Sequence, residues 1–260
     1  LGVGHRNRNA LASVRVQSRP SIMTSSPRFN IFCPLIFSLL LLGMSSCTTA
    51  DDTSPKVVNL LSEEIYPQWV QVGGKATYEL KDGVLIGISR PNTQNSFLCP
   101  PGRYANFELE FEVKCELRLN SGVQIRSSND LEDLNDKMPD SNRKAVEQKL
   151  AREDRMFGPQ IEIAANGNAG GVWFEAGKGW ISDLDPERTK TIYKNEDWNH
   201  YRVIAKGPKI QVFINDELIT DEVDEITFME TGKLGFQVHA VGYAEPSYVK
   251  WRNITLKDLP

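Results

Sequence analysis

The sequence predicts an all-β protein in which two antiparallel sheets pack as a sandwich or jelly roll. Residues 106–117 alternate strictly, with apolar side chains on one face and mostly charged side chains on the other, as in a half-buried strand. Further short apolar runs follow, with turn signals about every ten residues, and this spacing is typical of sandwiches and jelly rolls.

The other strands can be placed in order because turn signals separate neighbouring strands. Asp82-Gly83 favours a tight hairpin. Residues 206–209 contain Gly and Pro, and Asn215-Asp216 turns the chain again. The strands expected around these turns and after them are residues 78–80, 84–88, 201–205, 210–214, 218–219, 233–239 and 248–256.

The N-terminal region has the features of an export signal. Met23 is the expected true start, because it precedes a short basic stretch and the apolar run 31–44, which has the length of a signal-peptide core. Small residues then lead to Cys47, as in a bacterial lipobox. We therefore expect residues 1–46 to be a signal peptide and Cys47 to carry a lipid; the alternative is ordinary cleavage with Cys47 uninvolved.

The predicted product is an exported lipoprotein, anchored to a membrane through Cys47 and facing the periplasm or the cell surface. Residues 47–56 are polar and aperiodic, as expected of a lipid-anchored tether. Residues 57–260 have the length of one domain with a sizeable core.

The charge balance argues against a nucleic-acid partner. Residues 1–46 hold five of the 30 basic residues and no acidic residue, so 25 basic and 34 acidic residues remain, a net charge of −9. A phosphate-binding surface is not expected from that balance. In the predicted domain, Cys99 and Cys115 could form a disulfide or lie apart as small buried residues.

One segment, residues 127–157, interrupts the strand pattern. It is densely charged, and residues 141–152 have the composition of a short surface helix. We interpret it as a long, partly helical insertion between two strands, which could be a functional loop or simply a solvated surface.

A group of polar and aromatic residues stands where a sandwich usually carries Glu, Lys and Thr. On four predicted strands these residues lie opposite the apolar face, and planar amides, an arginine, carboxylates and indoles suit a sugar ligand. The candidate residues are Gln124 and Arg126, Gln160 and Glu162, Trp173 and Glu175, and Gln237 and His239, together with Trp180. Each also has a structural interpretation: Glu162 as an exposed strand residue paired with Arg126, the tryptophans as core, and His239 as a structural hydrogen-bonding residue.

Several of these stretches together resemble the 3-keto-disaccharide hydrolase domain family, formerly a domain of unknown function. The resemblance covers about residues 57–260. It is carried by Trp69 with residues 78–85, by 106–109 leading to 120–126, by 158–163 with 170–173, by 198–202, and by 235–239 with 249–254. The chain departs from many relatives in the order Gln160 then Glu162, where they place the acid first, and in its longer insertion.

The resemblance implies a concanavalin A-like jelly roll, similar to laminarinase-type glucanases, with a concave face that binds glycans. It also implies a 3-keto-glycoside or 3-keto-disaccharide substrate, cleaved by removal of the C2 proton, loss of the C1 substituent and addition of water. Glu162 or His239 is then the expected base and Glu175 the expected acid. Arg126 and either Gln160 or Gln237 are expected donors to the enolate, and Gln124, Trp173 and Trp180 complete the expected substrate contacts.

Other functions remain open at this level. Glu162 and Glu175 could be the paired carboxylates of a conventional glycosidase, or the protein could be a carbohydrate-binding lipoprotein without catalysis. The sequence has no metal-ligand spacing and specifies no cofactor, although a divalent metal could stabilise the enolate, with His239 and Glu162 as candidate ligands.

Overall fold

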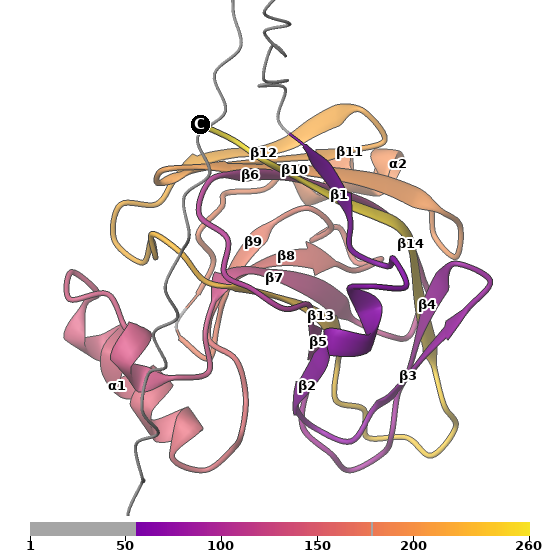
Figure 1. The fold of residues 1–260 in the computed structure, drawn as a ribbon, viewed down its shortest axis with the longest axis horizontal. Coiled ribbons are helices and arrows are strands. Elements are labelled where there is room, and N and C mark those ends of the chain that lie inside the picture. The colour runs from indigo at the N-terminus through magenta and orange to yellow at the C-terminus, as the bar shows by residue number, and fades with distance from the viewer. Residues whose placement is uncertain (1–55, 178) are drawn as a thin grey trace, which may run out of the picture. The chain divides into compact units, whose positions relative to one another are not determined.

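A computed structural model of the protein describes residues 56–177 and 179–260. The expected start at Met23, signal peptide, lipid site Cys47 and all but the last residue of the tether lie outside these residues and stay predictions. In the described residues the strands form two sheets, of eight and six strands, in which all paired strands run antiparallel. Figure 1 shows the two sheets stacked face to face.

Sheet A, the eight-stranded sheet, has the order β12-β11-β10-β6-β14-β4-β3, and β1 also pairs with β14. Its strands are β1 (Val57–Asn59), β3 (Thr77–Lys81), β4 (Val84–Ile88), β6 (Phe107–Cys115), β10 (Asn199–Lys206), β11 (Lys209–Ile214), β12 (Glu217–Val223) and β14 (Tyr248–Asp258).

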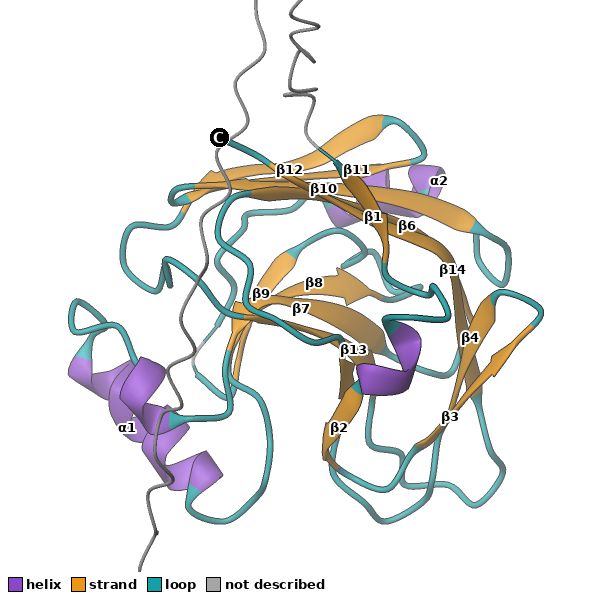
Figure 2. Ribbon diagram, in the orientation of Figure 1, coloured by secondary structure: helices purple, strands orange, loops and turns teal. Residues whose placement is uncertain are grey.

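Sheet B, the six-stranded sheet, has the order β2-β5-β13-β7-β8-β9. Its strands are β2 (Val70–Gly73), β5 (Ser96–Cys99), β7 (Ser121–Ser127), β8 (Gly158–Ile163), β9 (Val172–Glu175) and β13 (Lys233–Val238). Strands far apart in sequence are neighbours in both sheets, as Figure 2 shows, and the predicted all-β sandwich of two antiparallel sheets is confirmed.

The core lies between the two sheets because each sheet turns its apolar positions inward. Alternation along β6 buries Phe107, Leu109 and Phe111, while the glutamates between them are only half-buried. From sheet B, Phe236 meets these residues, and its ring centroid lies 5.8 Å from that of Trp251 on β14. This packing fixes which face of sheet B remains for a ligand.

Two α-helices, α1 (Asp140–Leu150) and α2 (Pro186–Ile192), and two 3₁₀-helices, η1 (Tyr66–Gln68) and η2 (Leu131–Asp133), are present in the described residues. The chain between β7 and β8 contains η2 and α1, and Figure 1 shows α1 to one side of the sandwich. None of the helices in this part of the chain is long and apolar enough to span a membrane.

The two cysteines of the domain are free thiols in the structure. Cys99 lies on β5 of sheet B and Cys115 on β6 of sheet A, and both are buried. Burial raises the pKa of each thiol to about 12, so neither is a reactive thiolate at neutral pH.

Candidate functional site

The candidate residues from four strands meet on the outer face of sheet B, the face turned away from the core. Side chains that are directly opposite on neighbouring strands lie in one row across the sheet. One row contains Gln237, Gly122 and Glu162. The adjacent row contains Gly235, Gln124, Gln160 and Trp173.

Gln160 is the centre of a buried hydrogen-bond network on this face. Its Oε1 accepts from Nε2 of Gln124 at 2.9 Å and from Nε2 of Gln237 at 2.7 Å. Its own Nε2 donates to Oε1 of Glu162 at 2.6 Å. Gln124 and Gln237 are 0% exposed and Gln160 is 2% exposed, so the glutamines lie beneath or at the floor of the site and fix its shape.

Glu162 is a nearly buried carboxyl group with two amide donors. Its Oε2 accepts from Nδ2 of Asn120 at 3.0 Å, and the side chain is 6% exposed. Burial raises the pKa of Glu162 to about 6, with Glu175 adding to the rise, while hydrogen bonds from Asn120 and Gln160 oppose it. A carboxylate with this pKa can accept a proton near neutral pH.

Glu175 is held by an ion pair. Its Oε1 pairs with Nη2 of Arg155, and Nδ2 of Asn95 lies 3.4 Å from the same oxygen. Glu175 is opposite Gly158, four residues along β8 from Glu162, so the two backbones are offset by about 13 Å along the strand. This anchoring makes Glu175 a charged wall of the site.

The two tryptophans stand together at the edge of sheet B. Trp173 and Trp180 form an isolated β-bridge, and their ring centroids lie 5.3 Å apart at an interplanar angle of 73°. Trp180 is 44% exposed and Trp173 is half-buried. The pair therefore offers aromatic surface to a ligand. Neither tryptophan belongs to the hydrophobic core, in contrast to the interpretation that both are core residues.

His239 follows the end of β13 and is half-buried. Its Nδ1 lies 2.7 Å from the backbone oxygen of Ala240, to which it can only donate. This contact commits Nδ1 and makes Nε2 the ring nitrogen that can serve a ligand.

Arg126 does not join the other candidates, and the prediction that it shares their face is wrong. The register between β7 and β13 shifts next to it, and its φ of 43° turns the chain at a β-bulge. Its guanidinium group instead donates to the backbone oxygen of Gly207 and lies 4.6 Å from the ring centroid of Phe228. It makes no ion pair with Glu162 in the described residues.

A pocket of about 290 Å³ forms where these side chains converge. Six candidate residues line it, and Gln124, Gln237 and Arg126 do not. Two further lining residues, Asn120 and Asn168, and the arginine that holds Glu175 were not predicted from the sequence. The lining residues are Asn120, Gln160, Glu162, Asn168, Trp173, Glu175, Trp180 and His239.

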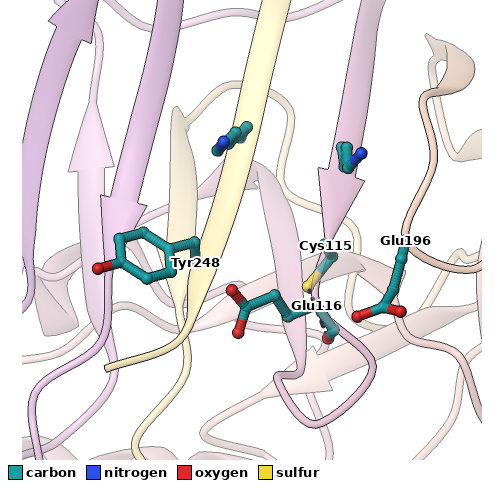
Figure 3. Close-up of a pocket in the computed structure, with 6 residues that line it drawn as sticks. Cys115, Glu116, Glu196 and Tyr248 are labelled. Atoms are coloured by element: carbon teal, nitrogen blue, oxygen red, sulfur yellow. Dashed lines mark hydrogen bonds between the residues drawn. The ribbon is translucent and has the colours of Figure 1, made fainter. Parts of the chain in front are cut away.

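A larger hollow of about 380 Å³ lies on sheet A and contains none of the candidates. Figure 3 shows its lining: the Tyr248 hydroxyl points away from Cys115, and the carboxylates of Glu116 and Glu196 lie on either side of that thiol. These groups do not converge on one point. We therefore place the functional site at the smaller pocket, where the polar groups do converge around a carboxyl of raised pKa.

The pocket offers limited ligands for a metal ion. Glu162 and His239, the two candidate ligands, both line it. Across residues 56–177 and 179–260, however, no group of three or more His, Cys, Asp and Glu side chains is placed to hold a metal ion. A metal at this site would therefore depend on amide, water or substrate oxygens for its other ligands, and we assign no step to one.

Gly122 is required by the glutamine network, which gives a first prediction. A Cβ atom on Gly122 would lie 2.6 Å from Cγ and Cδ of Gln160. Gly122→Ala is therefore expected to displace Gln160 and to cost about 1–3 kcal/mol of unfolding free energy, measured by urea denaturation. Gly242→Ala, where a Cβ meets nothing within 4 Å, is the matched control. Equal stability of the two variants would contradict a tightly packed network.

The fold and the pocket define a β-sandwich protein with a polar, tryptophan-edged pocket on sheet B. The chain belongs to the family of 3-keto-alpha-glucoside-1,2-lyase-like domains, whose sequence profile matches residues 58–257. The family expected from the sequence is thereby confirmed, and membership supports a function on glycans. No curated protein matches the sequence.

A solved structure agrees with the fold. A protein of unknown function with a galectin-like fold from Bacillus subtilis is 12% identical, with a TM-score of 0.52 over 78% of this chain and 94% of that chain. The carbohydrate binding module CBM66 from Bacillus subtilis is 15% identical, with a TM-score of 0.49 over 74% of this chain and 96% of that one. At 12% identity the likeness to the galectin-like protein concerns the fold alone.

Proposed function

We propose that this protein is a hydrolase that cleaves a 3-keto-glycoside or 3-keto-disaccharide in the pocket on sheet B. The observation that carries the proposal is Glu162, a nearly buried carboxyl group of raised pKa whose two oxygens are oriented by Asn120 and Gln160. A binding module needs aromatic surface but has no need of such a group, so this carboxyl favours catalysis.

The reaction uses the acidity that a C3 ketone gives to the C2 proton of the sugar. Glu162 removes this proton, and the electron pair forms an enolate whose oxygen is at C3. Reformation of the ketone expels the C1 substituent, which takes up a proton as it leaves. Water then adds to the enone, with its oxygen bonding to C1 and a proton returning to C2, so the net change is hydrolysis.

The other lining residues have roles that follow from their chemistry. Asn168 and His239 line the pocket, and we assign them to contact the enolate oxygen or the leaving group, His239 through Nε2. Trp173 and Trp180 cover the apolar face of a sugar ring. Glu175 is committed to Arg155, so we assign it to binding a sugar hydroxyl and not to the role of acid that the sequence suggested.

The proposal is tested with paired substrates. Purified residues 48–260 are incubated with a 3-keto-glucoside and with its unoxidised parent, with and without a chelator, and released aglycone is measured. Release from the keto form only supports elimination. Cleavage of the parent would identify a conventional glycosidase, and binding without turnover of either would identify a carbohydrate-binding protein.

The raised pKa of Glu162 gives a second prediction. The log of kcat/KM is expected to rise with slope about one below pH 6 and to level off above it, because only the carboxylate is a base. The raised pKa of Glu162 also means that its protonated form stabilises the fold, by about 2 kcal/mol when the pH is below the ordinary pKa of 4.5. This contribution is lost as the pH rises through 6. A flat rate profile between pH 5 and about 8 would exclude Glu162 as the base.

We also propose that the protein is exported and anchored by lipid on Cys47, as its N-terminal sequence indicates. Metabolic labelling of the full chain with a radioactive fatty acid in a bacterial host should mark the protein. Cys47→Ser should lose the label and move the protein to the soluble fraction. An unlabelled, soluble full chain would contradict the anchor.

A further inference from the structure

A short segment between α1 and β8 crosses the outer face of sheet B. We call residues 153–156 the strap. Oδ2 of Asp154 accepts from the backbone N of Gly73 on β2 at 3.3 Å, and Nη2 of Arg155 pairs with Glu175 on β9. Strands β2 and β9 are the two edges of the sheet, so strap side chains reach from one edge to the other.

The strap packs against two glycines of sheet B. A Cβ atom on Gly235 of β13 would lie 2.6 Å from Sδ of Met156, and one on Gly73 would lie 2.8 Å from the backbone oxygen of Asp154. Met156 is 0% exposed and its sulfur lies 3.4 Å from that of Cys99 on β5. The sheet is thus shaped to receive the strap, which is part of the packed structure.

The arginine of the strap is held on both sides. Its Nη1 lies 2.9 Å from Oε2 of Glu153, and its Nη2 pairs with the nearly buried Glu175. An arginine that holds two carboxylates in a poorly solvated position is costly to displace, because a charge would be left unpaired. The strap is therefore fixed against the wall of the pocket.

Strap residues line two other hollows. A hollow of about 540 Å³ is lined by Asp154 with residues 73–75 and 92–94. Another of about 710 Å³ is lined by Glu153, Asp154 and Arg155 with parts of the insertion and Lys233. Neither shares a residue with the pocket around Glu162, whose volume of about 290 Å³ is near the lower end of the usual range for ligand sites, about 300–1,000 Å³.

We propose that the strap closes the pocket on one side and restricts it to small glycosides and to the terminal rings of glycan chains. An internal ring of a long chain needs a groove that continues on both sides, and the strap occupies that path across the sheet. This proposal rests on the proposed function for the identity of the sugar, but it concerns which part of a glycan can enter. Arg155 and Met156 are its specificity-determining residues.

The test compares the binding of two maltoheptaoses by titration calorimetry, one with a free non-reducing end and one whose non-reducing ring is blocked by a 4,6-ethylidene group. Methyl α-glucoside is the small probe. The native protein is expected to bind the free chain and the small probe within about threefold of each other, and the blocked chain at least about tenfold more weakly. The double variant Arg155→Ala, Met156→Ala should bind the blocked chain less than about threefold more weakly than the free chain.

Two controls keep the result specific to the strap. Val203→Ala removes a buried side chain from β10 of the opposite sheet, so it reports any effect of lower stability alone, and it should discriminate as the native protein does. Arg155→Gln removes the ion pair while Met156 remains, and it should discriminate between the two chains to an intermediate degree. This single variant provides the test if the double variant folds poorly.

The outcomes separate the strap from the chemistry. Equal binding of free and blocked chains by the native protein, or unchanged discrimination in both strap variants, would overturn the role of the strap and leave the proposed hydrolysis intact. The expected binding pattern without turnover of a 3-keto-glucoside would support the strap and overturn the hydrolysis. Binding of no probe by any form would overturn the proposal that this pocket takes glucosides.

Discussion

Glu162→Gln is expected to lower kcat on a 3-keto-glucoside by a factor of about 10²–10⁴, the usual contribution of a general base. The amide has nearly the same shape as the carboxyl group and can still accept a hydrogen bond from Asn120 or Gln160, but it cannot take the C2 proton. KM is expected to change far less than kcat, because the proposed substrate contacts of the tryptophans and Glu175 are not altered.

The matched control for this prediction is Glu79→Gln. Glu79 is exposed on β3 of sheet A, so the same chemical change there should leave kcat unaltered. Steady-state kinetics above pH 7 measure both variants. If Glu162→Gln keeps the native kcat while His239→Ala loses it, the base is His239 and Glu162 has a structural role.

Much of the site was predictable because successive side chains of a strand point to opposite faces of the sheet. Gln124, Gln160 and Gln237 each stand opposite apolar neighbours, and the structure brings their side chains together on one face. The same rule could have found Asn120, which is two and four positions before Gly122 and Gln124 and lines the pocket with Glu162.

The failure at Arg126 has a definite cause. A β-bulge adds one residue to one strand only, so every position beyond it changes face. Arg126 itself has φ of 43°, which no apolar periodicity indicates. The parity that correctly placed Gln124 therefore fails two residues later.

Two parts of the site could not be predicted from local pattern. Asn168 lies in the turn between β8 and β9, where no period applies. Arg155 lies in a charged segment that reads as solvated surface, and its importance comes from Glu175, which the tertiary fold brings to it from β9. Contacts of this kind depend on strand order, and strand order is not encoded in the alternation of any one strand.

Gln160→Leu is the second change with a large expected effect, and it should act on stability and on the pH profile together. Leucine removes the acceptor for Gln124 and Gln237, which leaves two buried amide donors unpaired at about 1–3 kcal/mol each, so unfolding free energy should fall by about 2–6 kcal/mol. Loss of the donor to Glu162 should also raise the pKa of that carboxyl and move the rate profile to higher pH, because this hydrogen bond lowers its pKa in the native protein.

A loss of stability together with a shifted pH profile would show that the glutamine network tunes Glu162, whereas ordinary packing would affect stability alone. Gln211→Leu, at a half-buried position on β11 of sheet A, is the matched control and should change neither quantity much. Urea denaturation measures the first effect and kcat/KM against pH measures the second. A loss of stability with an unmoved pH profile would mean that Gln160 supports the sheet but does not tune Glu162, and the ionisation of that carboxyl would then depend on burial and Asn120 alone.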